Sequence, residues 1–168
     1  IDSSAVVDRI SKAFENTPAR SLPPEFLPTE PPQTSSREVI EEASIQLGHM
    51  HCSWHIPEVR HDDVPLIDVF STILGAGRSS RLYQKLRESE GIAHAADAWT
   101  YNPGNLGLFG VSAVMDGDKF SKVRDAVSRE LDLAIEKGVT QKEVDRAIKQ
   151  TVSATYSSRK TMQGIAQD

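Results

Sequence analysis

The side chains best suited to metal chemistry in this sequence are three histidines that alternate within one short stretch, His49, His51 and His55. On a β-strand, residues two and four apart point to the same side, and neutral imidazoles are good zinc ligands. A zinc site also needs groups that orient its ligands, and no carboxylate lies nearby in sequence on that face. We therefore expect structural or incidental histidines, with a free metal-binding module as the weaker alternative.

A second string, His55-Ile56-Pro57-Glu58-Val59-Arg60-His61, places a glutamate between two histidines. In zinc peptidases the motif His-x-x-Glu-His puts two histidines one helical turn apart, and its glutamate activates the metal-bound water. Here the second spacing is wrong, and Pro57 interrupts any helix. The string is predicted to be the end of a strand and a solvated loop, without catalytic zinc.

The composition is that of one ordinary globular domain, with 168 residues, 38% of them hydrophobic and 26% charged. A net charge of −5 argues against general nucleic-acid binding, and no apolar run approaches the ~18 residues of a membrane span. Cys52 is the single cysteine, which excludes an internal disulfide and a thiolate zinc cluster. One local basic cluster could hold a single anionic group such as a carboxylate: Arg78, Arg81, Lys85 and Arg87.

Residues 71–101 should position this chemistry, because they join a buried helix, a basic helix and a strand through glycine breaks. Gly75 and Gly77 are expected to end the first helix, since glycine takes positive φ without steric cost. Ser79 or Ser80 is expected to cap the second helix. The arginines of the basic helix would then lie around a short and rigid element.

This stretch reads Leu-Gly-Ala-Gly, Ser-Ser-Arg-Leu-Tyr, Leu-Arg-Glu and Gly-Ile-Ala-His. It resembles the non-catalytic domain of the insulinase-like (pitrilysin) zinc metallopeptidases, which reads Leu-Gly-Gly-Gly, Ser-Ser-Arg-Leu-Tyr, Leu-Arg-Glu and Gly-Leu-Ala-Tyr. In that family the arginine of Leu-Arg-Glu and the tyrosine seven residues on help to hold a peptide. The resemblance implies that Arg87 and His94 are substrate-binding residues, although His94 replaces the tyrosine. If the resemblance is set aside, Arg87 is expected to pair with Glu88 or Glu90, and His94 is expected to be an edge-strand residue.

Periodicity and turn residues outline the other elements. A helix is expected from about Ser4 to Glu15, capped by Ser3 or Ser4, and six prolines between positions 18 and 32 indicate an extended connector over residues 18–35. One long or broken strand is expected over residues 37–56. A helix is predicted over residues 64–74, followed by a hairpin of strands 93–101 and 106–115. The next helix is expected to be capped by Asp116 and ended by Gly138. The last helix should begin with a Thr140–Glu143 capping box, and its inner face should be lined by Val144, Ile148, Val152 and Tyr156.

This order of elements predicts an α+β fold with a mostly antiparallel sheet and helices packed largely on one face. The resemblance implies the metallohydrolase fold of mitochondrial processing peptidase and its relatives. Residues 1–168 are expected to be a single domain, and a piece of a longer multi-domain protein, with the connector within it.

By resemblance, the function is that of a non-catalytic, peptide-enclosing domain of a zinc-dependent metalloendopeptidase. Zinc would be bound on another domain or subunit of the parent protein, and no cofactor is expected in this chain. The alternative is a domain of an inactive homologue that acts as a structural or assembly subunit.

The expected partners are a peptide substrate and a catalytic domain or subunit, with no nucleic acid and no membrane span. The resemblance also places a strand before Ile1, so the sheet edge that lacks it could support self-association. The sequence leaves the compartment open.

Overall fold

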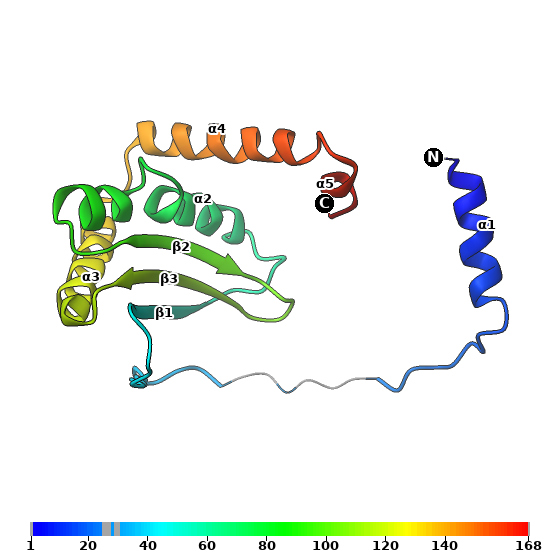
Figure 1. Cartoon of the computed structure of the whole chain (residues 1–168), viewed down its shortest axis with the longest axis horizontal. Helices are drawn as coiled ribbons and strands as arrows, with labels where there is room; N and C mark the ends of the chain where they lie inside the picture. The colour runs from blue at the N-terminus through cyan, green and yellow to red at the C-terminus, as the bar shows by residue number, and fades with distance from the viewer. Residues whose placement is uncertain (1, 25–27, 29–30, 168) are drawn as a thin grey trace. The chain divides into compact units, whose positions relative to one another are not determined.

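The computed structural model describes residues 2–24, 28 and 31–167, and its internal contacts divide the chain into two compact units, Ile1–Arg37 and Glu38–Asp168 (Figure 1). The first unit contains one helix, α1 (Ser3–Phe14). Its cap is Asp2, whose carboxylate accepts from the Ser4 backbone N–H at 3.0 Å and from the Ser4 hydroxyl at 2.6 Å. The predicted cap at Ser3 or Ser4 is therefore wrong by one or two positions.

The connector predicted over residues 18–35 has no regular secondary structure where it is described. Residues 25–27, 29 and 30 lie outside the described part of the chain. The interpretation of residues 1–168 as one domain stays a prediction.

The second unit contains all the strands and the other helices of the described chain. In chain order these are β1 (Gly48–Ile56), α2 (Val64–Gly75), the π-helix η1 (Tyr83–Ser89), β2 (Ala95–Tyr101), β3 (Gly107–Met115), the short 3₁₀-helix η2 (Gly117–Lys119), α3 (Phe120–Lys137), α4 (Gln141–Ser158) and α5 (Met162–Gln167). Among these helices none is long and apolar enough to cross a membrane.

The three strands form one antiparallel sheet in the order β1-β3-β2, with β3 in the centre (Figure 1). Side chains alternate between the two faces of a strand, and Val111 and Met115 of β3 are fully buried on the same face as Met50 of β1. Helices α2 and α3 pack on the sheet, and α4 packs on α2. The predicted α+β fold, with its antiparallel sheet and hairpin, is confirmed.

The first strand is shorter than predicted, because it begins at Gly48 and not near residue 37. Gly48 is aligned with Met115, the last residue of β3, so a longer β1 would have no ladder partner beyond that pair. Residues 38–47 consequently have no regular secondary structure, although they were expected to continue the strand. A β-strand forms only where a neighbouring strand provides hydrogen-bond partners for its backbone N–H and C=O groups.

Helix α3 buries Val123 and Val127, and Gly138 ends it as predicted, at a φ of 72°. The predicted lining of α4 holds only for Val144, which is half-buried. Ala147 is its buried residue, whereas Ile148 is 46% exposed and Tyr156 is 70% exposed.

Candidate functional site

The turn that leads into the candidate site depends on two glycines with different roles. Gly77 takes the left-handed conformation, with a φ of 76°, as predicted. Gly75 does not; it is the last residue of α2, and a Cβ there would lie 1.8 Å from the backbone nitrogen of Ala98. Gly75 is therefore needed because the backbone of α2 meets that of β2, and the prediction that it ends the helix by positive φ is wrong.

The basic helix is present, but most of it winds as a π-helix, η1. The Glu90 N–H donates to the Lys85 carbonyl five residues back, at 3.0 Å. Beyond Gly91, which has a φ of 59°, the Ala93 N–H donates to the Leu86 carbonyl at 3.2 Å. Leu86 itself is completely buried. A short π-helical turn is rare and is often found at functional sites.

Ser80 does not cap this helix in the predicted way. Its buried hydroxyl donates to the Gly77 carbonyl at 2.8 Å, so it stabilises the turn before the helix. Gln84 holds the same turn from the helix side, because its Nε2 donates to the Arg78 carbonyl at 2.6 Å.

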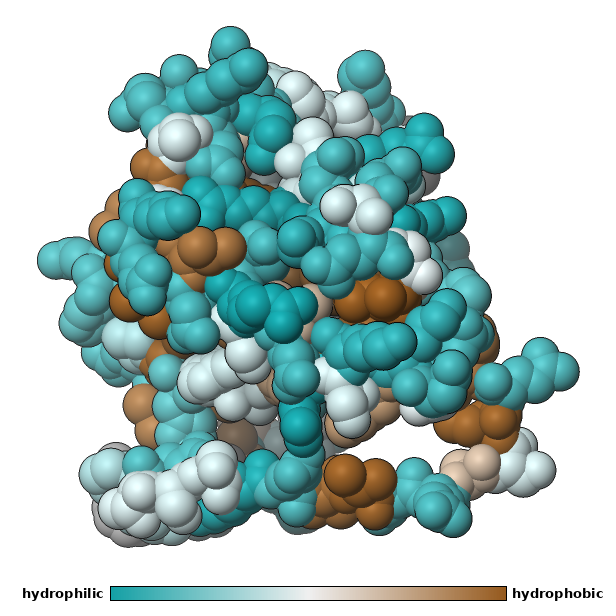
Figure 2. All heavy atoms as spheres, turned by 90° about the vertical axis from the view of Figure 1, so that its left-hand side faces the viewer, coloured by the Kyte–Doolittle hydropathy of each residue, from teal (hydrophilic) through white to brown (hydrophobic). Residues whose placement is uncertain are grey.

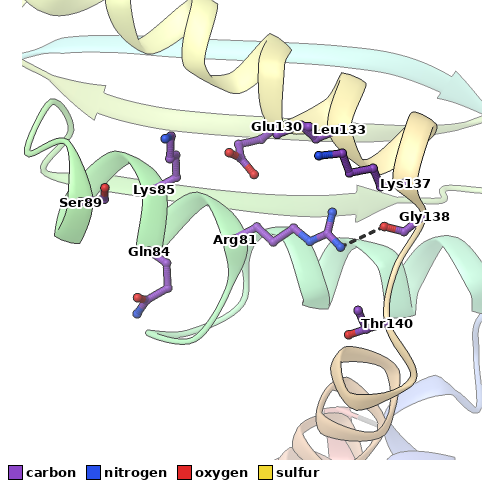
Figure 3. A pocket seen from close by; sticks show the side chains of 9 residues that line it. All are labelled: Arg81, Gln84, Lys85, Ser89, Glu130, Leu133, Lys137, Gly138 and Thr140. Atoms are coloured by element: carbon purple, nitrogen blue, oxygen red, sulfur yellow. Dashed lines mark hydrogen bonds between the residues drawn. The ribbon is translucent and has the colours of Figure 1, made fainter.

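Arg81 ties the start of this segment to the junction between α3 and α4. Its Nε and one terminal nitrogen donate to the two carboxylate oxygens of Glu143, at 2.7 and 3.0 Å. The same terminal nitrogen also donates to the Gly138 carbonyl at 3.0 Å, the bond drawn in Figure 3. The bond from Arg81, together with bonds from Thr140, lowers the pKa of Glu143 to about 2. Glu143 thus completes the predicted capping box with Thr140 and binds Arg81 at the same time.

A shallow groove of about 620 Å³ lies beside this contact (Figure 3). It is lined from η1 and from the junction of α3 and α4 by Arg81, Gln84, Lys85, Ser89, Glu130, Leu133, Lys137, Gly138 and Thr140. The surface at this end of the molecule is mainly hydrophilic (Figure 2).

The four basic side chains that were predicted to bind a single anion together all make contacts within the chain. Arg81 binds Glu143, and the Lys85 ammonium lies 3.2 Å from the Glu90 carboxylate. A hydrogen bond with Tyr83 raises the pKa of Arg78.

Arg87 is exposed on η1, and its guanidinium carbon lies 5.3 Å from the centroid of the Tyr83 ring. A cation at this distance from an aromatic face is attracted to the ring. Within the described residues, Arg87 thus contacts the Tyr83 ring, whereas the Glu90 carboxylate pairs with Lys85. Among the described residues the Arg87 guanidinium donates no hydrogen bond, so its N–H groups stay available to a ligand.

His94 lies just before β2, and its backbone N–H donates to the Val114 carbonyl at 2.8 Å. Its Nε2 lies 2.9 Å from Asp116 Oδ1, and Lys119 Nζ lies 2.8 Å from Asp116 Oδ2. These two partners, Lys119 first, lower the pKa of Asp116 to about 2. Asp116 makes no side-chain cap to the following helix, so its predicted capping role is wrong.

The Asp116 carboxylate, being ionised, only accepts hydrogen bonds, so His94 must donate its Nε2–H. A neutral His94 then has only Nδ1 left, as an acceptor. The tyrosine-like donor role implied by the resemblance would require the protonated imidazole.

The histidines of β1 lie on the sheet face opposite the buried residues. His49 and His51 are exposed, and His51 Nδ1 lies 2.9 Å from the Ser112 hydroxyl, which also accepts from Trp99 Nε1 at 2.7 Å. No group of three histidines, cysteines or carboxylates that could hold a metal occurs in the described part of the chain. These residues therefore do not fit a zinc site.

Sequence reasoning singled out Arg81, Arg87 and His94 but missed the residues that hold them. Tyr83 could have been found, because side chains four apart on a helix are neighbours. Asp116 is 22 residues from His94, and Glu143 is 62 residues from Arg81. No local pattern indicates either pair.

Comparison with known proteins decides the family. Residues 1–151 match the family described as the peptidase M16 inactive domain. The chain belongs to this family. An uncharacterized zinc protease of Streptomyces coelicolor is 31% identical over 167 residues, covering 92% of this chain and 35% of that protein. An uncharacterized zinc protease of Bacillus subtilis is 21% identical over 121 residues, which are 72% of this chain and 30% of that protein.

Solved structures agree with the fold. A protease from Helicobacter pylori superposes with a TM-score of 0.82 at 22% identity, covering 99% of this chain and 41% of that one. A peptidase M16 inactive domain from Pseudomonas fluorescens gives a TM-score of 0.60 at 19% identity, covering 66% of this chain and 27% of that one. This chain spans about a third of the length of the curated relatives, and the predicted resemblance to the insulinase-like zinc metallopeptidases is confirmed at the level of the family.

Proposed function

We propose that this M16 inactive domain helps to enclose an extended peptide in a zinc-dependent metalloendopeptidase. The proposal rests mainly on the match of residues 1–151 to the inactive-domain family. It is supported by a relative that is named as a zinc protease and is nearly three times longer than the segment matched to this chain. Zinc would be bound by a separate catalytic domain or subunit of the parent protein. That domain or subunit and the peptide are the partners of this chain.

Arg87 and His94 are the proposed peptide contacts. Arg87 is exposed, and its planar fork of donors suits a carboxylate or a backbone carbonyl. His94 would add an acceptor at Nδ1 for a peptide N–H when neutral, or a donor when protonated, because Asp116 engages Nε2.

The test is Arg87→Ala in the intact parent protein, assayed with a peptide substrate. Loss of a charge-assisted hydrogen bond to the peptide should lower kcat/KM by the equivalent of about 1 to 3 kcal/mol. Arg129→Ala, which removes an exposed arginine on α3, is the matched control and should leave kcat/KM unchanged.

Equal kinetics for both variants would remove Arg87 from the peptide path. An intact protein that neither binds zinc nor cleaves peptides would instead favour the alternative, a structural or assembly subunit.

A further inference from the structure

We propose that Tyr83 is a positioning residue for Arg87: its ring holds the guanidinium in the place from which it contacts a peptide. This inference rests on the proposed function of Arg87. It concerns a residue that does not itself touch the peptide and acts through the arginine.

The first observation is the stacking geometry. Tyr83 and Arg87 are four residues apart on η1, and the guanidinium carbon lies 5.3 Å from the ring centroid. Arginine has a long side chain with much rotamer freedom, and ordering it on binding a ligand costs affinity. A flat ring beneath the guanidinium removes part of that cost in advance while leaving the N–H groups available.

The second observation is that the ring is itself held. Tyr83 is half-buried, and its interaction with the Arg78 side chain raises the pKa of that guanidinium. Arg78 belongs to the turn that Gln84 fastens to the helix through the Arg78 carbonyl. The ring therefore joins the helix and the preceding turn, and a residue of this kind can place a neighbour reproducibly.

The third observation is the anchoring of the helix just before the pair, at Arg81, and within it, at Leu86. Arg81 is bound to Glu143 before it, and Leu86 is buried with its carbonyl accepting from Ile92 and Ala93. The backbone beneath Tyr83 and Arg87 is thus fastened to α4 and to the entry of β2. The freedom that remains is in the arginine side chain, which is the part that Tyr83 restrains.

The inference is tested with two substitutions in the intact parent protein. Tyr83→Leu keeps an apolar side chain but removes the ring face, and Tyr83→Phe keeps the ring but removes the hydroxyl. We expect Tyr83→Leu to lower kcat/KM roughly 3- to 10-fold and Tyr83→Phe to change it less. Tyr156→Leu, at an exposed tyrosine on α4, is the matched control and should have no effect.

A double-mutant cycle separates positioning from a general loss of structure. If Tyr83 acts through Arg87, adding Tyr83→Leu to Arg87→Ala should cause no further loss of kcat/KM. An equal loss in the presence and absence of Arg87 would overturn the inference, as would equal effects of the Leu and Phe substitutions.

The NMR signals of the Arg87 side chain in the 168-residue chain give a readout independent of activity. The ring current of Tyr83 should shift them upfield in the native chain and in Tyr83→Phe, and the shift should vanish in Tyr83→Leu. A native chain without this shift would overturn the inference even if Tyr83→Leu fails to fold. Unchanged kinetics for Arg87→Ala would refute the peptide contact instead, and the spectrum would then decide the Tyr83–Arg87 geometry by itself.

Discussion

At the scale of single residues, two of the arginines in residues 71–101, the signature segment, have opposite roles. Arg81 donates three hydrogen bonds, two to the Glu143 carboxylate and one to the Gly138 carbonyl, and both charged side chains are less than a fifth exposed. Arg87 lies over the Tyr83 ring and donates no hydrogen bond within the described residues. Their partners, and not their residue type, make the first a structural residue and the second a candidate for ligand binding.

The Arg81–Glu143 pair should make stability depend on pH. Glu143 has its pKa lowered from 4.5 to about 2, so its contribution is fully present above pH 4.5 and is lost as the pH falls toward 2. Glu143→Gln should cost about 1.5 to 3 kcal/mol of unfolding free energy at neutral pH, and this deficit should shrink in acid. Urea unfolding at several pH values between 7 and 2 measures both effects.

Glu136→Gln, at an exposed glutamate of α3, is the control for that experiment. It should leave the stability curve close to that of the native chain. A deficit for Glu143→Gln that stays constant from pH 7 to pH 2 would contradict the assignment.

At the scale of elements, the contact between α2 and β2 places the signature segment. It is a backbone-to-backbone approach at Gly75 and Ala98, and it sets where the following turn and η1 begin. On the other side, η1 is held by the capping box at the start of α4. The short helix is thus positioned by the elements before and after it more than by its own propensity.

Gly75→Ala should disturb this arrangement. Its Cβ would fall 1.8 Å from the Ala98 nitrogen and 2.7 Å from the Ala98 Cα, so α2 must move away from β2. Overpacking of this kind costs about 1 to 3 kcal/mol. Gly117→Ala, where a Cβ meets nothing within 4 Å, should be close to neutral in the same thermal unfolding experiment. Equal melting temperatures for the two variants would show that α2 yields without cost.

At the scale of the whole molecule, the chain carries the fold of its family without the motif that binds catalytic zinc. The string His-x-x-Glu-His is absent from the sequence. We expect no hydrolysis when the 168-residue chain is incubated with zinc and unstructured peptides. Cleavage that a chelator abolishes would be the contrary result, and mass spectrometry of the peptides detects it.

The sheet leads to a prediction about association. In the described chain, β1 and β2 are the outer strands, and each has one side without a strand partner. Unsatisfied backbone groups cost about 1 to 3 kcal/mol each when buried, so an open edge favours a further strand from another molecule. Sedimentation across micromolar concentrations should show self-association.

A lysine on the outer strand β1 should weaken that association, because charged side chains protect sheet edges. Ser53→Lys is the test and Ser153→Lys on α4 the control, both at exposed serines. A strictly monomeric native chain would contradict the prediction.

The sequence by itself determined the features that depend on neighbours along the chain. The glycine turns at Gly77 and Gly138, the Thr140–Glu143 capping box and the β2–β3 hairpin all follow local rules of backbone conformation and hydrogen bonding. The signature that revealed the family is local as well. Arg87 and His94 could be named as candidates for the same reason.

Only the tertiary structure decided the features that depend on distant partners. The first strand starts at Gly48 because β3 ends opposite it, and Gly75 is required by a strand that follows more than twenty residues later. Asp116 binds His94 instead of capping a helix, and Arg81 binds Glu143 instead of a ligand. Periodicity indicates which face of an element is apolar, but the partner of a polar group is set by which elements the fold brings together.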